Sequence, residues 1–221
     1  MDINQYIDHT LLKPTATLAD IEKLCQEAIA YNFFSVCVNS AFVKSAKEFL
    51  FSKNNVKICS VIGFPLGAMS TEAKLAELTQ AKIDGAHEFD MVINLGWLKS
   101  GKYDLVKEEI VKLKLAAGNS ILKVIIETCY LSEYEIVNAS KLAVEAEADF
   151  VKTSTGFGTG GATLEAINLM KKTVDGKAKL KASGGIRDLK TAKKYIDAGV
   201  SRIGTSNGIA IVTGTSSLNT Y

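Results

Sequence analysis

Eight short segments rich in β-branched residues recur along the chain, and their spacing constrains the fold more than any other feature. Their centres lie roughly 22 to 34 residues apart, the length of one strand followed by one helix. The expected strands are Tyr6–His9, Phe34–Val38, Lys57–Gly63, Glu88–Ile93, Leu122–Glu127, Phe150–Thr153, Lys179–Ser183 and Arg202–Thr205. This alternation predicts an α/β fold.

The stretches between these strands carry helical patterns. Apolar residues fall on one face of two expected helices, which are marked by Ile21, Leu24, Cys25, Ala28 and Ile29 and, more loosely, by Leu105, Val106, Ile110, Leu113 and Leu115. Thr17 with Asp20 and Ser132 with Glu135 have the spacing of capping boxes, and Asp188 can cap a later helix.

Size and pattern together predict one domain over residues 1–221, built as a single (β/α)8 TIM barrel. The chain has 221 residues, of which 47% are hydrophobic, enough to enclose one core. We expect residues 213–221 to form a mobile tail, because that stretch is polar. A doubly wound open sheet is the alternative. In a barrel, the chemistry lies at the C-terminal ends of the strands.

Two lysines occupy the middle of short apolar strands. Strand alternation places Lys152 on the inward face with Ser154, and Lys181 on the inward face of the next strand with Ser183. Two ammonium groups ~6 Å apart at an effective dielectric of ~20 repel by roughly 3 kcal/mol, so we expect the pair to supply a neutral, nucleophilic amine. The alternative is that one lysine reaches solvent while the other pairs with a carboxylate.

Further charged residues face the same interior. Asp90 lies on the face that Glu88 shares, Asp8 ends the first expected strand, and Lys123 opens the fifth. Each of them could form a plain structural ion pair, but several charges directed into one barrel are harder to explain without a polar ligand.

Glycine-rich turns follow the last three strands. They supply the candidate substrate- and phosphate-binding residues Gly156, Gly184, Gly185, Gly204, Ser206 and Asn207. Backbone N–H groups after the seventh and eighth strands of such a barrel frequently bind phosphate. The alternative is that these are tight turns that need positive φ.

Composition excludes several classes of protein. The formal charge of +2 comes from intermixed basic and acidic residues, so no nucleic-acid or membrane partner is expected. No apolar run approaches the ~20 residues of a membrane helix, and the N-terminal residues Met1–Asn4 show no basic region before an apolar stretch, so secretion is not expected. Four dispersed cysteines indicate reduced thiols in the cytoplasm, and two distant histidines disfavour a metal. Of the cysteines, Cys37 is either a reactive thiol or a small core residue, and we favour the core.

The motifs taken together resemble the deoxyribose-phosphate aldolase family, whose members are class I, Schiff-base-forming aldolases. The matching stretches occur in order over nearly the whole chain, at Ile7–Pro14, Val36–Asn39, Val61–Gly67, Glu88–Asn94, Leu122–Thr128, Phe150–Gly156, Lys181–Arg187 and Arg202–Ser206. The set is specific, although no single stretch would be.

This resemblance implies the roles of individual residues. It makes Lys152 the Schiff-base lysine and Asp90 with Lys181 the proton relay, supported by Asp8 and Lys123. It also implies that Gly184, Gly185 and Ser206 hold phosphate. Asn207 and Gly158 depart from the family pattern, in which serines are expected. Tyr221 resembles a terminal tyrosine that acts as an auxiliary proton donor, or it is an ordinary chain end.

The expected activity is therefore reversible cleavage of 2-deoxy-D-ribose 5-phosphate to D-glyceraldehyde 3-phosphate and acetaldehyde, a lyase reaction of deoxyribose phosphate catabolism. No cofactor is expected, the partner is a small phosphosugar, and a homodimer is the candidate assembly. Another phosphosugar lyase or isomerase on the same barrel would keep the glycine turns without needing paired lysines. A non-catalytic sugar-phosphate-binding barrel would bind without turnover.

Overall fold

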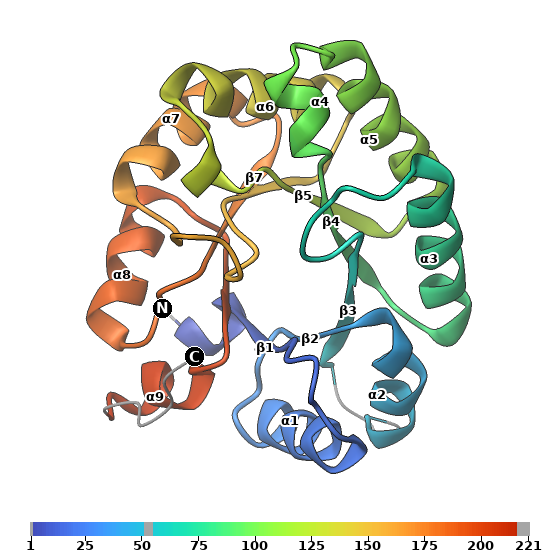
Figure 1. Ribbon diagram of the computed structural model, residues 1–221. Coiled ribbons are helices and arrows are strands. Elements are labelled where there is room, and N and C mark those ends of the chain that lie inside the picture. Colours follow the sequence, from blue (N-terminus) through green and yellow to red (C-terminus); the bar gives the residue numbers. More distant parts are fainter. Residues whose placement is uncertain (1, 51–54, 216–221) are drawn as a thin grey trace.

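The computed structural model describes residues 2–50 and 55–215, which form a closed parallel barrel inside a layer of helices (Figure 1). Each strand pairs with the next along the chain, and β8 closes onto β1. The barrel prediction is confirmed, and the open-sheet alternative is excluded.

Strands and helices alternate as the sequence spacing predicts. The strands are β1 (Ile7–Leu11), β2 (Ser35–Val38), β3 (Lys57–Ile62), β4 (Glu88–Val92), β5 (Ile121–Ile125), β6 (Phe150–Lys152), β7 (Lys179–Ser183) and β8 (Arg202–Thr205). The α-helices are α1 (Leu18–Ala30), α2 (Val43–Phe49), α3 (Thr71–Asp84), α4 (Leu95–Lys99), α5 (Tyr103–Ala117), α6 (Glu133–Glu145), α7 (Leu164–Val174), α8 (Leu189–Ala198) and α9 (Gly208–Thr213). Short 3-10 helices span Ile3–Tyr6, Ser40–Phe42 and Thr128–Tyr130.

Local sequence signals set where the helices begin. Thr17 and Ser132 each accept a hydrogen bond from the third helical residue and complete reciprocal capping boxes at α1 and α6. Asp188 caps α8 through the backbone N–H of Thr191. All three predicted caps are confirmed.

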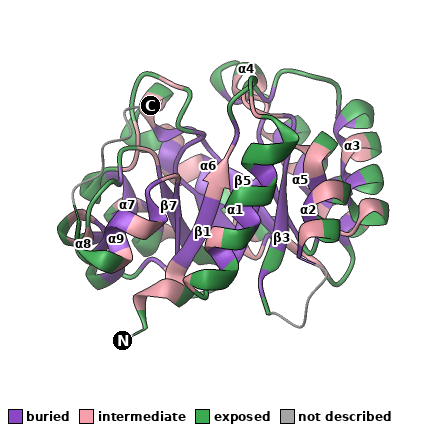
Figure 2. Cartoon of the chain, turned by 90° about the horizontal axis from the view of Figure 1, so that it is seen from below, coloured by how far each residue is buried: buried purple, intermediate pink, exposed green. Residues whose placement is uncertain are grey.

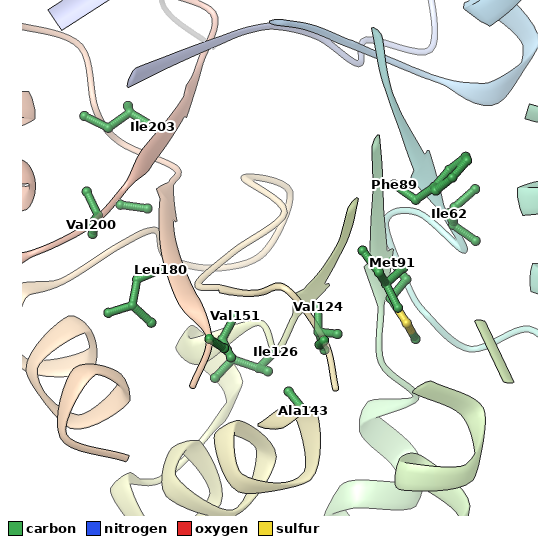
Figure 3. Close-up of a cluster of buried hydrophobic side chains, with 14 of the residues drawn as sticks. Ile62, Phe89, Met91, Val124, Ile126, Ala143, Val151, Leu180, Val200 and Ile203 are labelled. Atoms are coloured by element: carbon green, nitrogen blue, oxygen red, sulfur yellow. The ribbon is translucent and has the colours of Figure 1, made fainter. Parts of the chain in front are cut away.

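Apolar residues that point away from the barrel axis form the core between strands and helices. Figure 3 shows outward side chains of the strands, among them Phe89, Val124, Val151 and Leu180, directed toward the helix layer. Figure 2 shows buried strands and exposed outer helix faces.

Three residues of the predicted helical stripes lie outside this core. Ile29, Leu105 and Leu115 are 37%, 42% and 75% exposed. The other residues of both stripes are buried against the strands. An apolar residue at the edge of a stripe can therefore remain exposed to solvent.

Six of the eight strands differ from the prediction by one or two residues at an end, and β1 and β5 differ the most. Tyr6 belongs to a 3-10 helix that Asp2 caps, so β1 begins at Ile7 and continues beyond Asp8 to Leu11. The strand β5 ends at Ile125, and Glu127 has left-handed backbone with φ of 52°.

The chain end is described only in part. The helix α9 ends at Thr213, the first residue of the predicted tail, and Gly214 follows in the left-handed region. The predicted auxiliary residue Tyr221 lies outside the described residues. Within residues 2–50 and 55–215, every helix is too short or too polar to cross a bilayer.

Candidate active site

Seven charged side chains from six strands meet inside the barrel. All are nearly or completely buried, with at most 3% of each residue exposed. The carboxylates are Asp8, Glu88 and Asp90, and the cations are Lys123, Lys152, Lys181 and Arg202. Contacts between β4 and β7 cross the barrel, so these groups share one interior.

Asp90 is the centre of this cluster. Its Oδ1 lies 2.9 Å from the Nζ of Lys123, and its Oδ2 lies 2.7 Å from the Nζ of both Lys152 and Lys181. The register brings the lysines into place, because Asp90 pairs with Lys123 between β4 and β5, and Lys152 pairs with Lys181 between β6 and β7. One carboxylate therefore contacts three ammonium groups.

The remaining contacts close a circuit of alternating charge. Lys181 also contacts Asp8, whose Oδ1 lies 2.6 Å from Nη2 of Arg202. The same Arg202 nitrogen lies 2.6 Å from Glu88. Glu88 Oε2 in turn lies 2.6 Å from the Nζ of Lys123. We call the six members the charge ring: Asp90, Lys181, Asp8, Arg202, Glu88 and Lys123.

Lys152 lies outside the charge ring. Within residues 2–50 and 55–215, its one carboxylate contact is the Asp90 oxygen that it shares with Lys181. Of the seven charged residues, only Lys152 lines the cavity at the C-terminal end of the barrel. The position predicted for a nucleophile thus combines the fewest charge contacts with access to a ligand.

The two aspartates of the ring stay ionised despite burial. Burial alone would raise the pKa of Asp90, but Lys123, Lys152 and Lys181 hold it well below its ordinary value. Burial is likewise outweighed at Asp8, where Arg202 and Lys181 lower the pKa. Both aspartates are therefore carboxylates at neutral pH and can only accept hydrogen bonds.

Lys181 keeps its charge because carboxylates surround it. Burial would lower its pKa, but Asp8 and Asp90 hold it above the ordinary lysine value. The pKa of Lys123 is also raised, since Asp90, Cys59 and Glu88 outweigh its burial. The sequence argument counted the two neighbouring cations and omitted the carboxylates between them. Lys181 remains an ammonium group, able to donate a proton or a hydrogen bond.

A cavity of about 230 Å³ opens above Lys152. It is bounded by Thr10 and Leu12 of the β1 end and by the turns after β6, β7 and β8. All six predicted binding residues line it: Gly156, Gly184, Gly185, Gly204, Ser206 and Asn207. The structure brings these turns together at one end of the barrel.

Glycine is required at two of these positions. A Cβ on Gly204 would lie 2.6 Å from the Oγ of Ser183 and 3.1 Å from the Cε of Lys181. Gly184 has φ of 83°, and its Cβ would meet the Cα of Gly161 at 2.8 Å. The first glycine gives the Lys181 side chain room, and the second lets two turns touch.

Two contributors were missed by the sequence argument. Arg202 begins β8, and its inward position could have been read from the alternation through Gly204 and Ser206. Glu127 accepts from the backbone N–H of Thr155 at 3.1 Å and from its hydroxyl. Thr155 then accepts from the N–H of Phe157. Both Thr155 and Phe157 line the cavity, so a buried carboxylate of the β5 end orders its wall.

The cysteines of the barrel interior are packed rather than exposed. Cys37 is fully buried with Leu12, Cys59 and Val61. A hydrogen bond with Cys59 lowers the pKa of Cys37, against the effect of its burial. The sulfur atoms of Cys37 and Cys59 and a carboxylate oxygen of Asp90 lie within 4.8 Å of one another. Asp90 already contacts three ammonium groups, however, so the local charge opposes a metal cation.

One departure from the family pattern has a physical reason. A Cβ on Gly158 would lie 2.8 Å from the Sγ of Cys129 and 3.4 Å from the Cδ of Glu127. Glycine therefore fits beside Cys129 in this chain, where a serine would not fit without movement.

Comparisons with known proteins agree with this geometry. The sequence model of the DeoC/LacD family aldolases matches residues 3–215. The "Deoxyribose-phosphate aldolase" of Brevibacillus brevis is 59% identical over 214 residues, covering 97% of this chain and 96% of that protein. The solved structure of "QR15, an Aldolase" superposes with a TM-score of 0.92 at 46% identity, covering 96% of this chain and 95% of that one. A tetrameric deoxyribose phosphate aldolase from Aeropyrum pernix gives a TM-score of 0.85 at 34% identity, covering 94% and 88%.

Proposed function

Because the chain belongs to the DeoC/LacD family of aldolases, we propose that it is a class I lyase acting on 2-deoxy-D-ribose 5-phosphate. The products are D-glyceraldehyde 3-phosphate and acetaldehyde, and the reaction is reversible. One observation carries the residue assignment. Lys152 is the only one of the seven interior charged residues that lines the cavity, and it is the one outside the charge ring.

Catalysis begins at the amine. Neutral Lys152 adds to the C1 aldehyde of the open-chain sugar, and loss of water gives an iminium ion, which acts as the electron sink. A base takes the proton of the C3 hydroxyl, and the C2–C3 electron pair moves toward the iminium as that bond breaks. Glyceraldehyde 3-phosphate leaves. The enamine is then protonated at C2, and water releases acetaldehyde and the free amine.

The neighbours of Lys152 provide proton transfer and charge stabilisation. The Oδ2 of Asp90 lies 2.7 Å from the Nζ of both Lys152 and Lys181. Asp90 can therefore pass a proton between the two amines. We assign Asp90 and Lys181 to the proton relay, and Asp8 and Lys123 to its support. The negative Asp90 also stabilises the iminium cation once it forms.

The far side of the cavity suits the phosphate group. The turns that carry Gly184, Gly185 and Ser206 line it, with Gly156, Gly204 and Asn207 beside them. Such turns expose backbone N–H groups that can bind an anion. The Oγ of Ser183, buried and without a hydrogen-bond partner among the described residues, can serve a substrate hydroxyl.

The biological setting follows from the chemistry. We place the enzyme in the cytoplasm, in deoxyribose phosphate catabolism, with a homodimer as the smallest assembly to test. Light scattering would distinguish it from a monomer or from a tetramer such as that of the Aeropyrum pernix protein.

Trapping of the covalent intermediate tests the assignment. The protein is incubated with acetaldehyde and borohydride, digested and mapped by mass spectrometry, and a reduced ethyl adduct is expected on Lys152. Lys152→Met should abolish the adduct. Lys179→Met, a change at the exposed start of β7, should leave it intact. An adduct on any other lysine would overturn the choice of nucleophile, and absence of glyceraldehyde 3-phosphate from the sugar phosphate would overturn the activity.

A further inference from the structure

The charge ring is electrically neutral without Lys152. It contains three carboxylates and three cations, and each carboxylate contacts two ring cations. Lys152 therefore adds one positive charge that no ring carboxylate is left to neutralise. Inside a barrel, where water does not screen charge, one cation in excess favours loss of a proton.

Arg202 and Glu88 close this ring far from the cavity. Both are the first residues of their strands, whereas Lys152 is the last residue of β6. Neither lines the cavity, and neither contacts Lys152. The guanidinium is held from several sides, because its Nε donates to Asp8 at 2.7 Å, its Nη1 and Nη2 donate to Glu88, and its carbon lies 3.5 Å from the Phe34 ring centre.

Residues at the N-terminal end of such a barrel ordinarily serve stability. An ion pair that served stability alone would need only the contact between Arg202 and Glu88. Here, the Glu88 carboxylate also contacts Lys123, and Arg202 also contacts Asp8, so the pair is part of the electrostatic environment of Asp90.

We propose that Arg202 and Glu88 are positioning residues that set the charge state of the Lys152 amine through the charge ring. The inference rests on the proposed function, since it concerns the nucleophile of that reaction. Arg202 cancels the charge of one carboxylate, and Glu88 cancels that of one cation. Loss of Glu88 alone would leave four interior cations against two carboxylates, and loss of Arg202 alone would leave three against three.

All seven other strands contribute charged or titratable side chains to the barrel interior around Lys152. The charged ones are Asp8 of β1, Glu88 and Asp90 of β4, Lys123 of β5, Lys181 of β7 and Arg202 of β8. The strands β2 and β3 contribute the buried thiols of Cys37 and Cys59. Burial holds the pKa of Cys59 well above its ordinary value, so its thiol adds no charge at neutral pH.

The sign of the effect differs between the two partners. Glu88→Gln removes a carboxylate, so the amine loses its proton more readily and the acidic limb of the pH–rate profile moves to lower pH. Arg202→Gln removes a cation, so the ammonium form is favoured and the limb moves to higher pH. At an effective dielectric of ~20, loss of one unit charge inside the barrel gives a displacement on the order of one pH unit in each direction.

The test measures kcat/KM for sugar-phosphate cleavage from pH 5 to 9 in the wild type and in both variants. Borohydride trapping of acetaldehyde on Lys152, quantified by mass spectrometry over the same range, provides a readout of the amine itself. We expect opposite displacements in both measurements. Glu88→Gln/Arg202→Gln, which removes one charge of each sign, should return the profile to that of the wild type.

Charge-preserving variants separate this role from a structural one. Arg202→Lys and Glu88→Asp should keep the wild-type profile, even where thermal unfolding shows a lower Tm. If Arg202→Gln does not fold, Lys123→Gln removes another ring cation and must move the limb in the same upward direction. Displacements of equal sign, or none, in folded variants overturn the proposal. A wild type that neither cleaves nor traps overturns the proposed function instead.

Discussion

Two buried regions of this protein join lysines to carboxylates, and they behave in opposite ways. In the barrel interior, the pKa of Asp90 is lowered and that of Lys181 is raised, so both groups hold their charges. Between α3 and α5, Lys74 and Glu109 lie 2.9 Å apart and are fully buried. There, burial lowers the pKa of Lys74 and raises that of Glu109, so the pair is driven toward its neutral form.

The number of opposite charges around each group explains this difference. Asp90 contacts three ammonium groups, and their attraction exceeds the cost of burial. Glu109 has one ammonium partner, a backbone hydrogen bond from Asn94 and a weak hydrogen bond from Thr71 at 3.4 Å. The attraction of one partner does not offset the desolvation penalty of a buried charge, whereas the attraction of several partners can. A similar sequence signal, a buried lysine, therefore has two different outcomes.

The largest expected effect is on activity. Lys152→Met should reduce kcat for sugar-phosphate cleavage by about 10⁴-fold or more, because the nucleophile is lost. The same change should leave the thermal midpoint equal or higher, since it removes the one interior cation outside the neutral ring. The kinetic assay checks the loss of kcat, and calorimetry checks the thermal midpoint. A fall in Tm of several degrees would mean that Lys152 stabilises the barrel.

The helix-layer pair should respond in the reverse way. Lys74→Met leaves the buried Glu109 carboxyl group without its lysine partner, and we expect a loss of about 1 to 3 kcal/mol in the free energy of unfolding by urea, the cost of an unsatisfied buried polar group. The trapped adduct on Lys152 should still form in the folded fraction. Lys74→Met/Glu109→Leu, which leaves no charge behind, should recover most of the loss. A double variant as unstable as the single one would contradict this account.

Acid should separate the two regions. Asp8 has a folded pKa below its ordinary 3.8, so its contribution to stability is complete above pH 3.8 and is lost as the pH falls toward the folded value. Glu109 has a folded pKa above 4.5, so its contribution is lost as the pH rises beyond 4.5. Asp8→Asn should therefore flatten the stability curve below pH 3.8 by up to about 1.4 kcal/mol per pH unit.

The matched control for this titration is Glu109→Gln, which should change the curve only above pH 4.5. Urea unfolding followed by circular dichroism from pH 2 to 7 supplies both curves. Identical acid slopes in Asp8→Asn and the wild type would show that Asp8 is not held ionised in the folded protein.

Single hydroxyl groups give the smallest expected effects. Ser35 donates to the Oδ1 of Asp8 at 2.7 Å, and Ser35→Ala should cost about 1 to 2 kcal/mol because the acceptor stays ionised. Thr71→Val, beside Glu109, should cost about 0.5 to 1 kcal/mol, since that hydrogen bond is longer, at 3.4 Å. Chemical unfolding at pH 7 ranks the two variants, and the reverse order would contradict the comparison.

Much of the fold could be predicted because its signals are local. Strand spacing, the capping residues Thr17, Ser132 and Asp188, and the alternation through Lys152 and Lys181 depend on nearby positions along the chain. Strand ends were less accurate, since Tyr6 and Glu127 take conformations that their neighbours in space decide. Asp90, Lys152 and Lys181 were assigned to one interior correctly. The effect of these groups on one another's pKa values could not be predicted, because it depends on which carboxylate lies between which amines.

The sequence by itself determined the barrel, the inward faces of its strands and the glycine turns above them, because each of these follows from periodicity or from the conformational freedom of single residues. Only the tertiary structure decided that six charges form a closed neutral ring and that Lys152 lies outside it, beside the cavity. Residues from β1, β4, β5, β7 and β8 contribute to that ring. The electrostatic energy of a buried group depends on distances across the barrel, and those distances exist only after the chain has closed.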